Sequence, residues 1–551
     1  MFVQELKELL KGTLDVDETL IEIPKAEFGD LAYPCFKEAK QRKQSPAQIA
    51  QNIAQELKDD IPTHPVFENV EAKGPYLNFF IKPRVIAQKA MQSSFTSEKK
   101  DETIVIDYSS PNIAKPFSIA HLRSTAIGNA LKHIYKSRGY TVIGVNHLGD
   151  WGTQFGKLIA AYELWGDEKQ LEKNPLDHLI DIYQKFSEQE KLDPSLTEKG
   201  REWFKRLEEG DEQAVQLWEL FRELSLAEFK KYYSRLKVEF DSFKGEAFYI
   251  DKLDETIQKV KQKVRVEESE GAQVIKLDQF KQPPLILIKS NGTTTYHTRD
   301  LAAVFYRLEE YHPKKIIYVT DKRQKLHFEQ LFNALSLMGY DKNMFSHVDF
   351  GTMTFEGQVM STREGTFIFL EQVLDLAIEK AKSIIEEKNP QLKNKDKVAE
   401  QVGIGAIIFH DLVNDRTKDI DFSWEKALSF DGASAPYVQY THARISAILR
   451  KKSPQPQPDF TVINSKEERK LLRHMLLFND AIDDACKQEK PHIIAHYLLD
   501  LCQLYNTFYA HCQVLCEDET LMNARLHICK KVKEIIQYGL SLLGIEAPEE
   551  M

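Results

Sequence analysis

The stretch Ile104–Asp150, IVIDYSSPNIAKPFSIAHLRSTAIGNALKHIYKSRGYTVIGVNHLGD, decides the fold of this 551-residue chain. It opens with Ile104-Val105-Ile106, an apolar run of the length and composition of a buried strand. After a polar loop, apolar residues recur every three or four positions from Ile119 to Ile134, which predicts an amphipathic helix. Gly139 ends that helix, and Thr141–Val145 predicts a second buried strand. This order is a βαβ unit, the building block of doubly wound parallel sheets.

The loop between this strand and this helix lies where such folds bind phosphate groups, because the first turn of a helix offers unpaired N–H groups. The loop has neither a Gly-x-Gly-x-x-Gly pattern nor a Walker-A pattern. Lys115, Ser118 and His121 stand at the start of the helix instead. The arrangement predicts a phosphate-binding site of another type.

These residues, with a second string further along the chain, resemble the two signature motifs of arginyl-tRNA synthetases, which are class I aminoacyl-tRNA synthetases. The His-Ile-Gly-His-type motif aligns with Ser118–His121, and the Lys-Met-Ser-Lys-Ser-type loop aligns with Val359–Arg363. Both motifs are degenerate, with Ser118 for the first His, Ala120 for the Gly, Val359 for the first Lys and Thr362 for the second Lys. The resemblance extends from GDLAYPC near the N-terminus to LGIEAPEEM at the C-terminus.

The length and the patterns together predict a multidomain α/β and α protein. The expected units are a small N-terminal α+β domain at residues 1–95, a doubly wound, Rossmann-type catalytic domain at 103–370 with a charged helical insertion at about 157–240, a helical connecting segment at 371–430 and an all-α domain at 431–551. Strand patterns at Val274–Leu277, Leu285–Lys289 and Ile316–Val319 are expected to complete the doubly wound sheet. The resemblance implies that the first unit contacts tRNA and that the last binds the anticodon.

Composition excludes several classes of protein. No apolar run approaches the ~18 residues of a membrane-spanning helix, and the N-terminus is mixed in charge, so we expect neither a membrane anchor nor a signal peptide. Six cysteines without a Cys-x-x-Cys pair indicate a reducing cytoplasm and no tightly bound metal. The net charge of −10 disfavours sequence-blind nucleic-acid binding and requires local basic patches for a tRNA partner.

An arginine substrate offers a guanidinium group, which needs a carboxylate in a partly dry pocket. By resemblance, Glu246 and Asp300 hold this guanidinium and Tyr296 lies against the substrate side chain, while Asn112 and Gln324 hold the backbone groups of the amino acid. Taken alone, Asp300 could cap the following helix and Glu246 could be an exposed loop acid.

Activation joins the arginine carboxylate to the α-phosphorus of ATP, so the protein supplies mainly positioning and positive charge. The resemblance implies an ATP-binding set of Lys115, Ser118, Ala120, His121, Val359, Met360 and Ser361, and a catalytic set of Lys115, Ser118, His121, Met360, Ser361 and Arg363. Ser118 could also be only the helix N-cap. Family members that lack the second lysine of the loop carry one before the helix, and Lys115 stands there. ATP is expected as its Mg²⁺ complex.

For tRNA, the resemblance implies contacts by Tyr76 and Asn78 in the N-terminal domain. In the C-terminal domain, aromatic and basic residues that suit unstacked bases are Tyr437, Tyr440, Arg444, Tyr505 and Tyr509. The alternatives are a core tyrosine and capped turn at Tyr76, and a core-facing stripe at Tyr505 and its neighbours.

The implied activity is ATP-dependent ligation of L-arginine to its tRNA through an arginyl-adenylate, by a chain expected to be monomeric. A catalytically impaired tRNA-binding paralogue is the main alternative, because both signature motifs are degenerate. A smaller nucleotidyltransferase would share residues 104–150 but would lack the helical C-terminal region.

Overall fold

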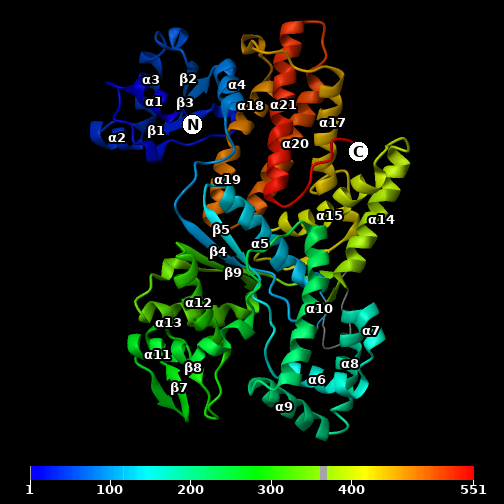
Figure 1. Cartoon of the computed structure of the whole chain (residues 1–551). Coiled ribbons are helices and arrows are strands. Elements are labelled where there is room, and N and C mark those ends of the chain that lie inside the picture. Colours follow the sequence, from blue (N-terminus) through cyan, green and yellow to red (C-terminus); the bar gives the residue numbers. More distant parts are fainter. Residues whose placement is uncertain (1, 114, 116, 356, 360–368) are drawn as a thin grey trace.

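A four-stranded parallel sheet lies at the centre of the computed structural model, which describes residues 2–113, 115, 117–355, 357–359 and 369–551. The strand order is β10-β9-β4-β5, and Figure 1 labels β9, β4 and β5 of this sheet. The strands are β4 (Thr103–Asp107), β5 (Thr141–Val145), β9 (Lys315–Asp321) and β10 (Phe345–Phe350). All three pairings are parallel, and β4 pairs with β5 on one side and with β9 on the other. The βαβ unit expected from the sequence is therefore confirmed.

Helices cover both faces of this sheet. Successive residues of a strand point to opposite faces, and β4 is apolar on both, so each face must be covered. Ile104 and Ile106 are buried in one apolar cluster with α5 (Ile119–Ser137). Val105 between them is buried in a second cluster, which contains residues of α12 (Tyr296–Tyr311) and α13 (Lys325–Leu337). Because the strands are parallel, the loops that follow β4, β5 and β9 all lie at the carboxyl-terminal edge of the sheet.

One expectation about this sheet is wrong. The segments around 274–277 and 285–289 form strands, but these belong to a separate antiparallel sheet of β6 (Glu267–Ser269), β7 (Ala272–Ile275) and β8 (Leu285–Ile288). The connection from Ile275 to Leu285 is shorter than the dozen residues that a parallel crossover needs, so the two strands pair as antiparallel neighbours. The outer strand of the parallel sheet next to β9 is β10 instead.

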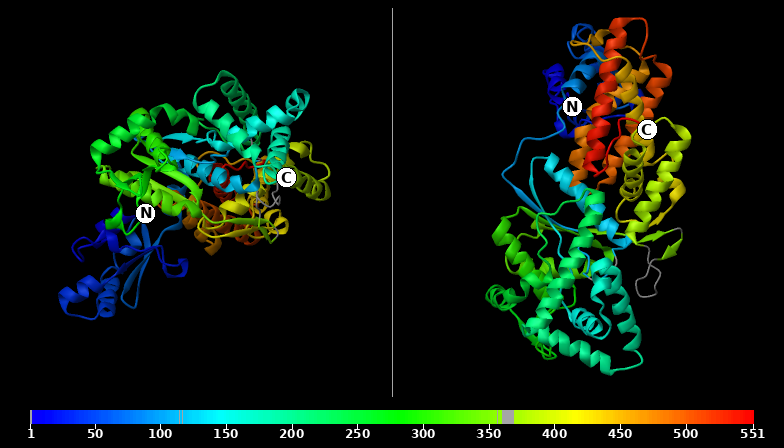
Figure 2. Two further views of the ribbon diagram at one scale, coloured as in Figure 1. Left: turned by 90° about the horizontal axis from the view of Figure 1, so that it is seen from below. Right: turned by 45° about the vertical axis from the view of Figure 1, so that its right-hand side comes forward.

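Helices make up the insertion after β5 and lie at the opposite end of the molecule from the last helices of the chain, α17 to α21 (Figures 1 and 2). The insertion contains α6 (Thr153–Trp165), α7 (Glu168–Lys173), α8 (Pro175–Gln189), α9 (Ser195–Glu208) and α10 (Glu212–Leu236), and α11 (Leu253–Lys263) precedes the antiparallel sheet. The C-terminal helices are α14 (Leu370–Lys388), α15 (Lys395–Leu412), α16 (Trp424–Ala427), α17 (Ala435–Lys451), α18 (Lys466–Leu476), α19 (Phe478–Gln488), α20 (His492–His511) and α21 (Glu519–Leu542).

The N-terminal domain is a small antiparallel sheet with helices, and it lies beside the C-terminal bundle (Figure 1). Its elements are α1 (Val3–Leu10), β1 (Leu31–Pro34), α2 (Phe36–Arg42), α3 (Pro46–Glu56), β2 (Phe67–Lys73), β3 (Tyr76–Ile81) and α4 (Pro83–Gln92). The guanidinium of Arg469 on α18 bonds the buried carboxylate of Asp30, with Nη2 and Oδ2 2.6 Å apart. The N-terminal domain is thus tied to the bundle by an ion pair as well as by α4–α18 packing.

A buried ion pair connects α5 to α15. Arg123 on α5 is 1% exposed, and its Nε lies 2.9 Å from Oδ1 of Asp411 on α15. Its Nη1 donates to the carbonyl of Gly351, just before β11 (Met353–Phe355), which pairs with β12 (Gln358–Val359) and β13 (Ile420–Phe422). Within the described residues, no helix is both long and apolar enough to cross a membrane.

Candidate active site

A cavity of about 720 Å³ opens at the carboxyl ends of the parallel strands, the usual ligand position in open α/β sheets. Residues from the loop after β4, from α5, from the segment after the insertion, from α12 and from the start of α13 line it. Six residues that the sequence singled out are among them: Asn112, His121, Glu246, Tyr296, Asp300 and Gln324. The fold therefore brings together groups separated by more than 200 positions in the chain.

The loop after β4 is strained where it enters this cavity. Ser109 and Ser110 have φ values of +71° and +47°, in the left-handed region that residues with a side chain rarely adopt. Beyond them, Asn112 bridges to Gly149 of the loop after β5. A Cβ on Gly149 would lie 2.0 Å from Oδ1 of Asn112, so only glycine permits this approach. Gly149 in the loop after β5 thus positions Asn112.

Ser118 is the N-cap residue of α5, and it also fixes the ring of His121. The backbone N–H of Ser118 donates to Nδ1 of His121 at 3.1 Å. Because Nδ1 accepts this bond, the neutral ring carries its proton on Nε2. Burial lowers the pKa of His121 to about 4, so the imidazole is neutral at physiological pH. The ring lines the cavity as a neutral N–H donor at a helix N-terminus.

The other residues of the expected ATP and catalytic sets come from the loop before α5, from α5 itself and from the segment around β12. The charge of Lys115 contributes to lowering the pKa of His121, so the ammonium lies near that ring. Ala120 lies in α5 and Val359 in β12. Met360, Ser361 and Arg363 lie outside the described residues.

Glu246 begins a short 3₁₀ segment, Glu246–Lys252, whose first turn faces the cavity. Its side chain is 19% exposed, so it is not an exposed loop acid. Burial raises the pKa of Glu246 to about 7, against the opposing effect of Arg299. The Arg299 Nε and the Glu246 Oε2 are 3.7 Å apart, and the Arg299 guanidinium lies 4.8 Å from the centre of the exposed ring of Tyr296.

Asp300 lies inside α12, whose N-cap is Thr295, so the suggestion that Asp300 caps this helix is wrong. Its Oδ2 is 2.5 Å from Nε2 of His327 on α13. Burial alone would raise the pKa of Asp300, but the bond to His327 and the nearby imidazoles hold it below its usual value. Asp300 is therefore ionised at neutral pH, whereas the carboxyl of Glu246, with its pKa of about 7, is only partly ionised there.

Three polar residues at this site, which the sequence did not single out, form a buried group. Asp107, the last residue of β4, pairs with the buried guanidinium of Arg307 on α12, with Oδ2 and Nη2 2.7 Å apart. The same Nη2 lies 3.4 Å from Nδ1 of His147. An acid at the carboxyl end of the first strand was a signal that could have identified Asp107. Arg307 and His147 could not be linked to it without the tertiary structure.

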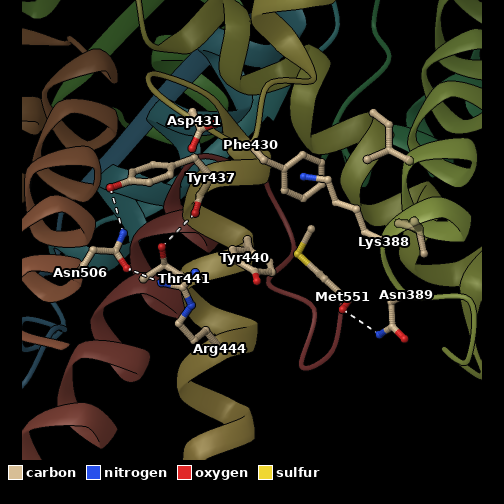
Figure 3. Close-up of a pocket in the computed structure, with 12 residues that line it drawn as sticks. Lys388, Asn389, Phe430, Asp431, Tyr437, Tyr440, Thr441, Arg444, Asn506 and Met551 are labelled. Carbon is tan, nitrogen blue, oxygen red and sulfur yellow. Dashed lines mark hydrogen bonds between the residues drawn. The ribbon is translucent and has the colours of Figure 1, made fainter. Parts of the chain in front are cut away.

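A second pocket, of about 480 Å³, lies between α14, α17, α20 and the C-terminal residue (Figure 3). Tyr437, Tyr440 and Arg444 of α17 line it. Asn506 joins two of them, because its Nδ2 donates to the Tyr437 hydroxyl at 3.1 Å and its Oδ1 accepts from Arg444 Nη1 at 3.0 Å. The Arg444 guanidinium also lies 4.9 Å from the ring centre of Tyr440, which is 39% exposed. This is a fixed cation beside an accessible aromatic ring.

The remaining candidates for tRNA contact differ in exposure. Tyr509 is 42% exposed, but Tyr505 is 0% exposed and its hydroxyl lies 3.7 Å from the thiol of Cys529. The expectation that Tyr505 contacts a base is therefore wrong, because its ring belongs to the core of the bundle. In the N-terminal domain, Tyr76 is half-buried with its ring edge-on to that of the exposed Phe36, and Asn78 is 4% exposed.

Comparisons with known proteins agree with this architecture. Three protein families match consecutive parts of the chain: "Arginyl tRNA synthetase N terminal domain" at residues 1–81, "tRNA synthetases class I (R), catalytic domain" at 83–424, and "DALR anticodon binding domain" at 438–551. An arginine–tRNA ligase of an Exiguobacterium species is 46% identical over 98% of this chain and 97% of that relative. The ligase of Clostridioides difficile is 43% identical over 100% of this chain and 98% of its own length.

Solved structures give the same result. The Thermus thermophilus arginyl-tRNA synthetase superimposes with a TM-score of 0.83 at 28% identity, covering 100% of both chains. Nothing in these comparisons favours a catalytically impaired paralogue. The fold, the site and the full-length relatives lead to one conclusion: the chain belongs to the arginyl-tRNA synthetases, class I enzymes that use ATP to join L-arginine to tRNA.

Proposed function

We propose that Glu246 and Asp300 together bind the guanidinium of L-arginine, with the ring of Tyr296 against its aliphatic stem. The observation that carries this proposal is the convergence of two largely buried carboxylates from separate segments on one cavity, beside an aromatic ring. A guanidinium offers donors in a fixed planar fork that can bridge two carboxylates, whereas the ammonium of lysine has no such fork. Asn112 and Gln324, on the same cavity, bind the amino and carboxylate groups of the substrate.

The phosphate-binding part of the proposal rests on the N-terminus of α5. There the neutral His121 donates from Nε2 while the helix dipole supplies about half a positive charge. Lys115 adds a full charge near the same ring. Val359, Met360, Ser361 and Arg363 are assigned to ATP by resemblance of the sequence alone.

In the proposed reaction, a carboxylate oxygen of arginine attacks the α-phosphorus of ATP and pyrophosphate leaves, which gives arginyl-adenylate. A hydroxyl of the terminal tRNA nucleotide then attacks the activated carbonyl and releases AMP. ATP would enter as its Mg²⁺ complex, so the metal accompanies the substrate. Within the described residues, no cluster of three or more His, Cys, Asp or Glu side chains is arranged to hold a metal ion.

The proposed tRNA contacts lie on two domains. Tyr440, Arg444 and Tyr509, with Tyr437 beneath them, form a stacking and cationic surface that suits unpaired anticodon bases. Tyr76 is proposed for a second contact through the N-terminal domain; Asn78 is not, because it is 4% exposed and its side chain is buried. We also propose that the protein acts as a monomer in the cytoplasm, where its six free cysteines stay reduced.

The Glu246→Gln variant tests the guanidinium assignment, because it keeps the shape of the side chain and removes its charge. A lost charge-assisted hydrogen bond costs about 1.5–3 kcal/mol, or roughly ten- to a hundredfold in the KM for arginine. The KM for ATP is expected to stay constant. Glu255→Gln, at an exposed glutamate paired with Lys259, is the matched control. An unchanged KM for arginine in Glu246→Gln would remove Glu246 from the site.

A further inference from the structure

One carboxylate of the proposed arginine site has a partner within the protein. Nε2 of His327 lies 2.5 Å from Oδ2 of Asp300, although 27 positions separate the two residues. An ionised carboxylate only accepts hydrogen bonds, so Nε2 is the donor whichever charge the ring carries. Within the part of the chain that the structure describes, no other side chain is recorded in a hydrogen bond with Asp300.

The ring of His327 is itself held in place from two sides. It stacks on the ring of His297, with centres 4.3 Å apart and planes at 25°. The ring of Phe328 meets it edge-on at 5.2 Å. His327 is the third residue of α13, and Gln324 is the N-cap residue of the same helix. The donor nitrogen is thus fixed by the packing of α12 against α13 and not by a flexible stem.

This arrangement divides the two oxygens of Asp300 between different tasks. Oδ2 is engaged by His327, whereas Oδ1 remains for a ligand in the cavity that Asp300 lines. A guanidinium is planar and directional, so its binding depends on the angle of the carboxylate plane. A lysine ammonium is a compact charge that rotates freely, and its attraction depends mainly on distance. The orientation of Asp300 therefore matters more for arginine than for lysine.

We propose that His327 is a positioning residue for amino-acid selection: it fixes the carboxylate plane of Asp300 and thereby favours arginine over lysine. The proposal rests on the assignment of Asp300 to the guanidinium made above. His327 acts through Asp300, and its nitrogen need not touch the substrate.

Three substitutions at His327 separate orientation from packing. His327→Ala removes the donor and the ring. In His327→Gln the side-chain amide nitrogen stands the same number of bonds from Cβ as Nε2 of histidine, so it can restore the bond to Asp300. His327→Asn carries the same amide one carbon shorter and serves as the matched control. Each full-length variant is compared with the parent by its Tm, by calorimetric binding of L-arginine, and by ATP–pyrophosphate exchange in the presence of tRNA, with L-lysine as competitor.

His327→Ala is expected to raise the Kd of arginine about tenfold, because misplacing a binding group by a fraction of an ångström weakens directional contacts of this kind. Inhibition by lysine and the KM for ATP should not change, so the preference for arginine over lysine falls by the same factor. His327→Gln should recover most of the loss and His327→Asn should not. Equal values for Gln and Asn, or an unchanged Kd in His327→Ala, would overturn the proposal.

A double-mutant cycle with Asp300→Asn distinguishes failure of this proposal from failure of the site assignment. If His327 acts through Asp300, His327→Ala has no further effect on the Kd of arginine in the Asp300→Asn background. If Asp300→Asn leaves the Kd unchanged, the assignment of Asp300 to the guanidinium is wrong and the proposal falls with it. If Asp300→Asn weakens binding but the two effects add, only the role of His327 is refuted.

Discussion

Lowering the pH from 8 to 6 is expected to weaken arginine binding, because Glu246 must be ionised to pair with a guanidinium. Burial raises the pKa of this carboxyl to about 7. Below its pKa the group is protonated and neutral, so the affinity for arginine is full at high pH and is lost as the pH falls through about 7. Asp300, whose pKa is lowered, stays ionised over this range.

The magnitude follows from the fraction of enzyme in which Glu246 is ionised. With a pKa of about 7, roughly nine-tenths of the carboxyl groups are ionised at pH 8 and roughly one-tenth at pH 6. The apparent Kd of arginine should therefore rise about tenfold over these two pH units. The guanidinium keeps its charge throughout, since its pKa exceeds 12.

Calorimetric titration of the parent enzyme with L-arginine between pH 6 and 8.5 measures this slope directly. The Glu246→Gln variant is the internal control, because its side chain cannot ionise while every other titrating group remains. Its Kd should be high at all pH values and should lack the slope centred near pH 7. A parent Kd that is flat across this range, or a slope that persists in Glu246→Gln, would refute the reasoning.

Three further outcomes are expected. Lys115→Ala should lower the kcat of adenylate formation about 10²–10³-fold with little change in the KM for arginine, because its ammonium is expected to act mainly in the transition state. A variant with a lowered Tm but a normal kcat would show that Lys115 only anchors its loop. Tyr440→Ala should raise the KM for tRNA about tenfold, in line with the loss of one stacked base, and leave arginine–ATP kinetics unchanged; an unaltered KM for tRNA would exclude it from the anticodon surface. Asp411→Ala should reduce the free energy of unfolding by about 3–5 kcal/mol, because it leaves the buried guanidinium of Arg123 without its carboxylate. Denaturant titration measures this free energy, and a loss below about 1 kcal/mol would contradict the prediction.

Local sequence was sufficient for the central βαβ unit. The apolar spacing from Ile119 to Ile134 and the run Ile104-Val105-Ile106 each specify an element through contacts within a few residues. Ser118 is the N-cap residue of α5, as the sequence also suggested, and the structure adds His121 to the same cap. The motif resemblance then supplied the family, and with it the acids on η4 (Glu246–Lys252) and α12 as candidates.

The pairing of strands that lie far apart in the chain could not be predicted from local sequence. The segments at 274–277 and 285–289 have strand composition in any sheet, and composition does not say with which partner they pair. The same limit applies to faces of a helix. Tyr505 and Tyr509 stand one turn apart, yet one is buried and the other exposed, because α21 covers only part of that surface.

The sequence by itself determined the central βαβ unit and, through the resemblance, the family and the candidate residues that line the cavity. Only the tertiary structure decided how their side chains are paired: His327 with Asp300, Arg307 with Asp107, and Arg299 beside Glu246. The physical reason is that charge pairing and burial depend on distances between residues far apart in the chain. Those distances also set the pKa values, so the difference in ionisation between Glu246 and Asp300 arises from the folded cavity and not from the residue types.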